Sequence, residues 1–283
     1  MTIRSSTRLL TLAAALTLSL GACGAVEKEG AAPTTPKPSP IGDATTTANP
    51  TQSEPAPTIA TVAEGKLTVC TNPPYAPFED TVGDQVVGFD MDLMTEVASD
   101  MGLKVAFVET PFVSIESAVS LETGSCDVGA SALTINPQRE AKMRFSEPYY
   151  ETSLALLVKA DSGIATLADL TGKAVGVQQG TTGEDWANDQ PELTQIKQYE
   201  GLGDQVTALK AGDVAGAFND EPTLTPYVEE GFTVLGPFAE GESFGFAVKL
   251  DNAALQAQIN TTLQRVRDDG TYDALIAKWF SEG

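Results

Sequence analysis

Apolar and polar positions alternate from Gly65 to the C-terminal end of the sequence with two different periods. Short apolar runs bounded by polar residues predict β-strands, and apolar positions three and four residues apart predict amphipathic helices. Strands and helices that follow one another in turn are typical of α/β architecture with mainly parallel sheets. About 220 residues are enough for one large core, or for two lobes of roughly 100 residues each.

The pattern predicts elements in two similar units, and we assign their apolar faces to the core. In the first unit we expect strands at residues 67–71, 105–108 and 127–131, helices at 90–101 and 115–121, and a helix start at Asn136. In the second unit we expect strands at 174–177, 196–199 and 215–219, and helices at 183–188 and 204–211. A strand at 244–248, a long helix with its apolar face from Leu255 to Val266, and a last helix at 271–280 are expected after it.

The first 22 residues have the features of an export signal. Arg4 and Arg8 precede an apolar run over residues 9–20 that is too short to span a bilayer, and small residues follow it. The sequence Leu-Gly-Ala-Cys at residues 20–23 resembles a bacterial lipobox, which implies that Cys23 becomes the lipidated first residue of the mature protein. An ordinary cleaved signal with an incidental cysteine is the alternative.

Residues 23–64 have a different composition. Prolines stand among Thr, Ala, Ser and Glu, with almost no aliphatic periodicity. Such a segment cannot bury a core, so we expect a disordered linker between a lipid anchor and the folded part of the chain.

The formal net charge of the chain is -22, from 39 acidic and 17 basic residues. This balance argues against nucleic acid as a partner, because no basic surface is left to neutralise phosphates. An acidic surface is also repelled from anionic lipid. We therefore expect membrane attachment through acyl chains on Cys23, palmitate among them, at the extracytoplasmic face of the cell membrane.

The chain has no histidine, which excludes Ser/His/Asp triads, Cys/His dyads and histidine-ligated metals. The segment Gly180–Gly183 lacks the spacing of a nucleotide-binding loop, and we expect neither a metal nor a cofactor. Cys70 and Cys126 remain after Cys23, and an even number in an exported protein indicates a disulfide. Two buried thiols are the alternative.

A candidate anion site lies between residues 130 and 140. The segment reads as a strand that runs into a helix, with Asn136 as N-cap, Pro137 at the first helical position and Arg139 in the first turn. First-turn N–H groups and a guanidinium together suit a carboxylate. A capped helix with a surface arginine is an equally good interpretation of the spacing alone.

Four further positions are candidates, each with a structural alternative. The turn before the helix at 183–188 offers N–H groups near Thr182, or is a plain strand-to-helix turn. Asp220 follows an apolar strand and could hold an ammonium, or could cap a helix. Tyr75 and Phe112 fall in loops near strand ends, where aromatic rings either fill the core or stack on a ligand.

Taken in order, several motifs resemble the polar amino-acid binding proteins of ABC importers, the bacterial extracellular solute-binding protein family 3. The resemblance covers residues 65–280. The motifs are GFDMDL at 88–93, CDVGAS at 126–131, TINPQR at 134–139, FSEPYY at 145–150, VQQGT at 177–181 and DGTY at 269–272.

The resemblance implies a two-lobed type II periplasmic-binding-protein fold, with two hinge strands that let the lobes close on a ligand. It places lobe 1 at 65–151 and 245–283, and lobe 2 at 152–244. It further implies a ligand carboxylate bound by Arg139, Thr134 and the main chain of Ala132, with an N–H from Thr182. Asp220 would take the ligand ammonium, and Tyr75 and Phe112 would enclose the ligand side chain.

The specificity positions depart from better-understood relatives. Asn72 stands where binders of lysine, arginine, histidine and glutamine have Asp, and Gln178 stands where the glutamine binder has Lys. An amide does not neutralise a cation as a carboxylate does, although Glu79 or Glu109 could substitute. Two amides suit a polar side chain, uncharged or basic.

The family resemblance implies a monomeric substrate-binding protein that captures an amino acid and delivers it to a permease with ATPase subunits. An exported cyclohexadienyl or arogenate dehydratase on the same fold is the competing hypothesis, with Glu79 or Glu109 as its acid. A sensor or cell-wall enzyme module is a third, which would need further sequence after Phe280.

Overall fold

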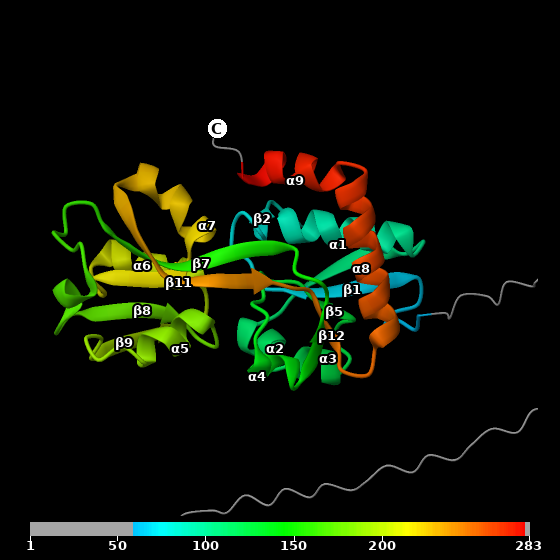
Figure 1. The fold of residues 1–283 in the computed structure, drawn as a ribbon, viewed down its shortest axis with the longest axis horizontal. Helices are drawn as coiled ribbons and strands as arrows, with labels where there is room; N and C mark the ends of the chain where they lie inside the picture. Colours follow the sequence, from blue (N-terminus) through cyan, green and yellow to red (C-terminus); the bar gives the residue numbers. More distant parts are fainter. Residues whose placement is uncertain (1–58, 281–283) are drawn as a thin grey trace, which may run out of the picture. The chain divides into compact units, whose positions relative to one another are not determined.

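The structure is a computed structural model that describes residues 59–280. Its first five-stranded sheet has the order β4–β1–β5–β12–β6 (Figure 1). The pairings β1–β4 and β1–β5 are parallel, and β12 is antiparallel to both β5 and β6. The strands are β1 (Lys66–Thr71), β4 (Lys104–Glu109), β5 (Val128–Gly129), β6 (Met143–Phe145) and β12 (Ala247–Lys249), and β2 (Asp80–Val82) and β3 (Gln85–Val87) form a separate hairpin.

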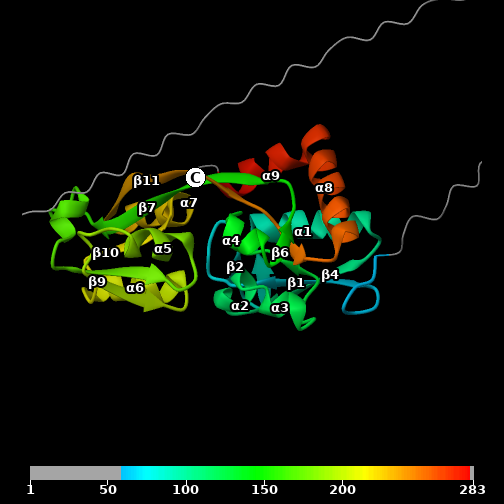
Figure 2. The ribbon, with the colours of Figure 1, turned by 60° about the horizontal axis from the view of Figure 1, so that its bottom comes forward.

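Helices cover both faces of the first sheet. Helix α1 lies on one side of β1, and α2 and α3 lie on the other (Figures 1 and 2). Met94, Val97 and Ala98 of α1 are buried as their spacing predicts, and α8 and α9 pack beside this helix. The elements are α1 (Phe89–Asp100), α2 (Phe112–Glu116), α3 (Val119–Glu122), α4 (Pro137–Glu140), α8 (Ala253–Asp268) and α9 (Thr271–Phe280).

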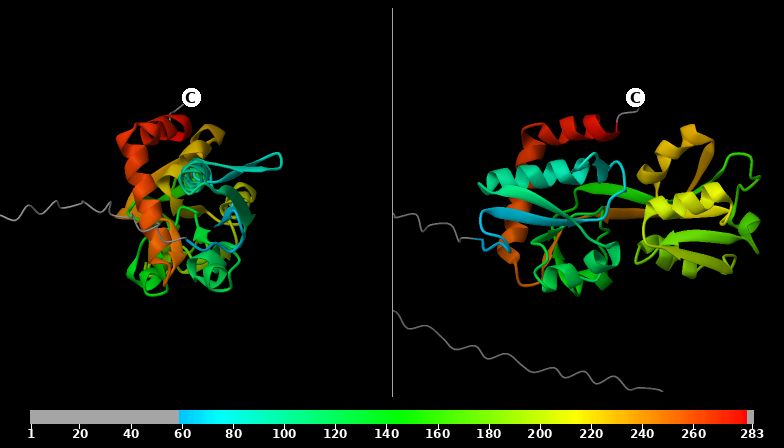
Figure 3. Two further views of the ribbon diagram at one scale, coloured as in Figure 1. Left: turned by 90° about the vertical axis from the view of Figure 1, so that its right-hand side faces the viewer. Right: turned by 180° about the vertical axis from the view of Figure 1, so that it is seen from behind.

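The second five-stranded sheet has the order β11–β7–β10–β8–β9. β8 is parallel to both β10 and β9, and β7 is antiparallel to both β10 and β11. Helices α5 and α6 lie on opposite sides of this sheet (Figures 1 and 3). The elements are β7 (Tyr150–Lys159), the 3-10 helix η1 (Leu167–Leu170), β8 (Ala174–Gln178), α5 (Thr182–Asn188), β9 (Gln195–Tyr199), α6 (Leu202–Ala211), β10 (Gly216–Asp220), α7 (Glu221–Leu224), the 3-10 helix η2 (Thr225–Glu230) and β11 (Phe232–Phe244).

The two longest strands, β7 and β11, lie side by side from the second sheet toward the first (Figure 1). Their pairing runs from Lys159 opposite Phe232 to Tyr150 opposite Phe244, with two register shifts that allow the pair to bend. At its far end, Phe244 pairs with Thr134 in an isolated bridge. This bridge ties β11 to the segment that precedes Arg139.

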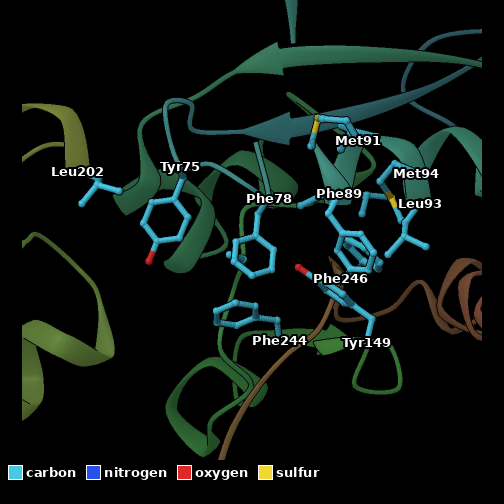
Figure 4. Close-up of a cluster of buried hydrophobic side chains, with 14 of the residues drawn as sticks. Tyr75, Phe78, Phe89, Met91, Leu93, Met94, Tyr149, Leu202, Phe244 and Phe246 are labelled. Carbon is cyan, nitrogen blue, oxygen red and sulfur yellow. The ribbon is translucent and has the colours of Figure 1, made fainter. Parts of the chain in front are cut away.

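Aromatic side chains fill the region where β7 and β11 of the second sheet approach the first sheet. The ring of Phe78 meets those of Phe244 and Tyr150 edge to face, at centroid distances of 5.1 Å and 5.0 Å. Tyr149 stacks on Phe246 at 4.1 Å (Figure 4). Edge-to-face and offset arrangements suit the charge distribution of aromatic rings and fix their orientation. The cluster therefore anchors the strand pair to the first sheet.

Three predicted elements differ from the structure. The strand expected at 127–131 is reduced to the two residues of β5, Val128–Gly129. The helix expected at 115–121 is two short helices, because Ala118 adopts a left-handed φ of 68° between α2 and α3. The strand expected at 244–248 is divided between β11 and β12. A side chain at Gly245 would come within 2.8 Å of Ile135, so this glycine permits close approach of the 134–135 segment.

The structure joins Cys70 and Cys126 in a disulfide whose Cα atoms are 5.7 Å apart, inside the range that a disulfide requires. Between residues 59 and 280, no helix is long and apolar enough to cross a membrane. The export signal, Cys23 and all but the last residues of the 23–64 linker lie outside the described residues.

Candidate functional site

The residues predicted for the site line one pocket between the carboxyl ends of the strands of both sheets. Asn72 and Tyr75 follow β1, and Gln178 and Asp220 end β8 and β10. The carboxyl end of parallel strands is where α/β folds bind ligands. The pocket also takes in Ser131 and Thr181, and its remaining lining is Phe112, Ala132, Thr134, Arg139 and Thr182.

The cavity at the centre of the pocket has a volume of about 10 Å³. It is small because the polar groups around it hydrogen-bond to one another across the pocket. Arg139, Asp220 and the amides of Asn72 and Gln178 all make such hydrogen bonds.

Arg139 is positioned by the predicted helix start. The side chain of Asn136 accepts a hydrogen bond from the Arg139 N–H at 2.9 Å, and Pro137 occupies the first turn of α4. The guanidinium is 3% exposed and lies 5.6 Å from the Phe112 ring centroid. Its Nη1 donates to Thr134 O at 2.8 Å and its Nη2 to Gly180 O at 2.9 Å. The surface-arginine alternative is therefore wrong, and a carboxylate could replace the two carbonyl acceptors.

Burial lowers the pKa of Arg139, and the charges of Glu116, Asp220 and Glu242 oppose this change. The guanidinium stays protonated at any physiological pH, because arginine is not deprotonated in proteins. The guanidinium is buried and charged, but its hydrogen-bond acceptors are neutral carbonyl oxygens. Such a group is well suited to bind an anion that enters the pocket.

Gly180 approaches helix α2 closely. Its φ is +80°, and a Cβ there would lie 3.1 Å from Glu116 Cγ. Its N–H donates to the Glu184 carboxylate at 2.7 Å, and Thr181 caps α5. Thr182 donates its hydroxyl to Glu242 at 3.3 Å. The turn is thus a true helix start that also lines the pocket.

Ala132 is held in a left-handed conformation, with a φ of 44°. Its N–H donates to Asp90 Oδ2 at 3.0 Å, and the Tyr149 hydroxyl donates to the same oxygen at 2.7 Å. A residue other than glycine rarely adopts this φ, so the Asp90 contact helps to hold the pocket wall in place.

Asp220 faces the pocket and does not cap α7 with its side chain. Its carboxylate is hydrogen-bonded to the Tyr75 hydroxyl and accepts a longer bond from Thr152 Oγ1 at 3.4 Å. Burial raises the pKa of Asp220 to about 7, and Glu242 adds to the rise, whereas Tyr75 and Arg139 oppose it. An ammonium beside this carboxylate would favour its ionised form.

The two specificity amides contact each other. Gln178 Nε2 donates to Asn72 Oδ1 at 3.3 Å, and Asn72 Nδ2 donates to Thr110 O at 3.0 Å. Gln178 is 2% exposed. One end of the pocket is therefore polar but formally uncharged.

Neither acid proposed as a substitute for Asp at position 72 lines the pocket. Glu109 is exposed at the end of β4. Glu79 is buried and accepts a hydrogen bond from Ser131 Oγ. Burial, with the nearby Asp90 carboxylate, raises the pKa of Glu79 well above its ordinary value. Both acids are thus wrong as groups that touch a ligand directly.

Sequence reasoning missed several residues near the site. Ser131 and Thr181 line the pocket, and Glu242 approaches it from β11. Gln205 and Asn219 are buried directly behind it. Gln205 had a detectable signal, because it interrupts the apolar stripe of α6 between Leu202 and Leu209.

Two helix-covered sheets line one pocket, and the long strands β7 and β11 run from the second sheet toward the first. This arrangement is that of a binding protein with the type II periplasmic-binding-protein fold. The family model for bacterial extracellular solute-binding proteins, family 3, matches residues 67–282, and the chain belongs to this family.

Proteins similar to this chain are named for amino-acid binding. ABC transporter arginine-binding protein 1 of Escherichia coli K12 is 30% identical over 80% of this chain and 95% of its own length. The histidine-binding periplasmic protein of Salmonella typhimurium LT2 is 32% identical over 76% and 87%. The solved structure of an ancestral amino acid-binding protein, AncCDT-1, described as a precursor of cyclohexadienyl dehydratase, is 32% identical over 77% and 96%, with a TM-score of 0.71.

Proposed function

We propose that this protein captures a free amino acid outside the cytoplasm and delivers it to the permease of an ABC importer. The observation behind the proposal is that one pocket contains a buried guanidinium, Arg139, and a carboxylate, Asp220, supplied by different sheets. The two charges are complementary to the α-carboxylate and α-ammonium of any amino acid. The names of the relatives, which bind arginine and histidine, support the same ligand class.

Within this proposal, residues 65–151 with 245–283 and residues 152–244 act as two lobes. β7 and β11 connect them, and a bend in this pair would open the pocket. A ligand that replaces the contact from Arg139 to Gly180 O would hold the lobes together. The closed form, bound to its ligand, would dock on the permease and its ATPase subunits as a monomer.

The ligand side chain would lie between the rings of Tyr75 and Phe112, with Ala132, Thr134 and Thr182 completing the carboxylate site. Its end would reach Asn72 and Gln178. Amides there favour a polar side chain, uncharged or basic, over an aliphatic one.

Attachment of the protein to the membrane is a further part of the proposal. Cys23 would carry the lipid anchor, and residues 24–64 would act as a tether long enough to let the binding domain reach the permease. The acidic composition supports this part of the proposal, because an acidic surface is repelled from anionic lipid.

The dehydratase hypothesis has one supporting observation, the similarity to AncCDT-1. It requires an acid that reaches the substrate ring, and neither Glu79 nor Glu109 is among the pocket-lining residues. Incubation with prephenate or arogenate, followed by product absorbance, distinguishes an enzyme from a binding protein.

The experiment that tests the proposed function is a thermal-shift screen of the common amino acids, followed by calorimetry on those that raise the melting temperature. Tight binding stabilises the folded state by about 2.7 kcal/mol at a ligand concentration a hundred times the dissociation constant. The proposal is wrong if no amino acid stabilises the protein, or if blocked amino acids without a free carboxylate bind as tightly as free ones.

A further inference from the structure

A chain of hydrogen-bonded amides connects the core of the second sheet to the pocket. It runs from Gln205 on α6 through Asn219 on β10 to Gln178 on β8 and Asn72 after β1. Gln205 is fully buried and Asn219 is 3% exposed. Each amide has an oxygen that accepts and a nitrogen that donates, so the orientation of one constrains the next.

Main-chain carbonyls determine the orientation at the core end. Gln205 Nε2 donates to Gly176 O and to Phe218 O, both at 2.8 Å. Because these partners are acceptors, only the nitrogen of Gln205 can face them. Its oxygen therefore faces Asn219 and requires a donor, which Asn219 Nδ2 supplies at 3.0 Å.

Asn219 uses both ends of its side chain. Its Oδ1 accepts from the Asp220 N–H at 3.0 Å and is hydrogen-bonded to the Tyr75 hydroxyl. Its Nδ2 donates to Gln205 and, at 3.5 Å, to Gln178 Oε1. A rotated Asn219 would set its nitrogen against an N–H and its oxygen against the Gln205 oxygen.

The pocket end is oriented in the same way. Asn72 Nδ2 donates to Thr110 O, so the oxygen of Asn72 faces Gln178 Nε2. The amide oxygens of Asn72 and Gln178 each accept one hydrogen bond within the chain and keep a second lone pair, and their nitrogens each donate one and keep a second N–H. A ligand amide can pair with both kinds of group, whereas a carboxylate can use the N–H groups alone and is repelled by the oxygens. Backbone carbonyls at both ends are thus consistent with one set of amide orientations, in which Asn219 donates hydrogen bonds in both directions.

We propose that Asn219 is a positioning residue for ligand specificity. Through Gln178 it orients the amide oxygens of the pocket so that they accept hydrogen bonds from the ligand side chain. Side chains that end in N–H groups, such as amides, guanidinium or ammonium, are selected, and side chains that end in carboxylates are rejected. The inference rests on the proposed function, because it concerns the side chain of the same amino-acid ligand.

The test is calorimetry of the full chain with norvaline, glutamine, arginine and glutamate. Norvaline reports the binding of the α-groups and an aliphatic side chain. Glutamine and glutamate have side chains of equal length, one ending in a neutral amide that donates and accepts and the other in a charged carboxylate that only accepts. We expect glutamine or arginine to bind at least about tenfold more tightly than norvaline, and glutamate at least about a hundredfold more weakly than glutamine.

Two variants of Asn219 separate polarity from charge. Asn219→Asp replaces the donor by an acceptor, and Asn219→Leu removes both without adding charge. In each, the advantage of glutamine and arginine over norvaline should fall to about twofold or less. Asn188→Asp, at an exposed position on α5, adds the same charge and should keep the wild-type ratio. If neither Asn219 variant folds by circular dichroism, Gln178→Met tests the next amide in the chain with the same expected loss.

Two results would overturn the proposal and leave the proposed function standing. One is glutamate binding as tightly as glutamine to the wild-type chain. The other is that the folded Asn219 variants, or Gln178→Met, keep the same ratio of glutamine affinity to norvaline affinity as the wild-type chain. Failure of all four amino acids to bind would also overturn the inference, and it would contradict the proposed function as well if the thermal-shift screen of the common amino acids finds no ligand.

Discussion

Arg139 Nη2 donates a hydrogen bond to Gly180 O at 2.9 Å, and this contact joins α4 to the turn before α5 across the pocket. The two residues belong to segments on different sheets. A carboxylate that takes this N–H gives the guanidinium a charged acceptor in place of a neutral one. The residue proposed to bind the ligand carboxylate thus also makes a contact across the pocket.

Replacement of Arg139 by Ala should weaken amino-acid binding by at least about a hundredfold, because the ligand carboxylate would be buried without its partner. Arg139→Lys should recover only part of the affinity, since a lysine does not form the bidentate pair. Calorimetry with glutamine and arginine measures both. Arg144→Ala, at an exposed position on β6, is the matched control and should bind normally. Wild-type affinity in Arg139→Ala would exclude the carboxylate role.

Affinity should depend on pH through Asp220. Because its pKa is raised to about 7, the carboxyl is largely protonated at pH 5.5 and cannot pair with the ligand ammonium. Binding of glutamine should therefore be about tenfold to thirtyfold weaker at pH 5.5 than at pH 8. Asp220→Asn should bind weakly at both values, without the pH dependence. An affinity that is constant between pH 5.5 and 8 in the wild-type chain would contradict the ammonium role.

Stability should also depend on pH, through the buried acid Asp90. Burial raises its pKa to about 7, and the buried Glu79 pKa moves in the same direction. An acid whose pKa is raised on folding binds its proton more tightly in the folded state. Its contribution to the free energy of unfolding is fully present below about pH 4 and is lost as the pH rises through about 7.

Asp90→Asn should consequently reduce the difference in melting temperature between pH 5 and pH 8.5. The oxygen of the introduced amide can still accept from Ala132 and Tyr149, so the pocket wall keeps its contacts. Asp84→Asn, in the exposed turn of the β2–β3 hairpin, should leave the wild-type difference unchanged. An equal effect of the two substitutions would show that Asp90 does not titrate in this range.

The disulfide between Cys70 and Cys126 closes a segment with a sequence separation of 56. Replacement of both cysteines by Ala should lower the free energy of unfolding by about 2–5 kcal/mol, because the unfolded chain regains conformational freedom. Urea titration with and without reductant measures this. Reductant should destabilise the wild-type chain and have no effect on the double variant. Two free thiols in the unfolded, unreduced wild-type protein would contradict the pairing.

Cys23→Ser should release the protein from the membrane fraction of the cells that make it. The physical reason is that acyl chains on Cys23 are the only anchor proposed for a strongly acidic chain. Mass spectrometry of the membrane-extracted wild-type protein should find an acylated N-terminal cysteine. An unmodified N-terminus at any position would exclude the lipid anchor.

Local sequence determined the elements whose signals are contained within a few neighbouring residues. The last helix was predicted at 271–280 and α9 has those bounds, and the Asn136 cap forms as its spacing indicated. The prediction of one helix at 115–121 was wrong, because the left-handed backbone of Ala118 divides it into α2 and α3. The spacing of apolar residues does not reveal such a break. The sequence could not decide whether Cys70 and Cys126 form a disulfide, or whether the Asp220 side chain caps a helix. Both depend on distances between atoms that the sequence does not contain.

Sequence order determined the family and the positions that line the pocket, since each of them lies beside a strand end or a helix start that local patterns mark. The tertiary structure alone decided how those side chains pair. Tyr75 meets Asp220 across a separation of 145 residues, and Gln178 meets Asn72 across 106. The orientations of the hydrogen-bonded amides around Asn219 depend on which carbonyls face Gln205 and Asn72. Those neighbours follow from the packing of helices on the sheets. Hydrogen-bond direction is a property of three-dimensional neighbours, so no spacing along the chain could have supplied it.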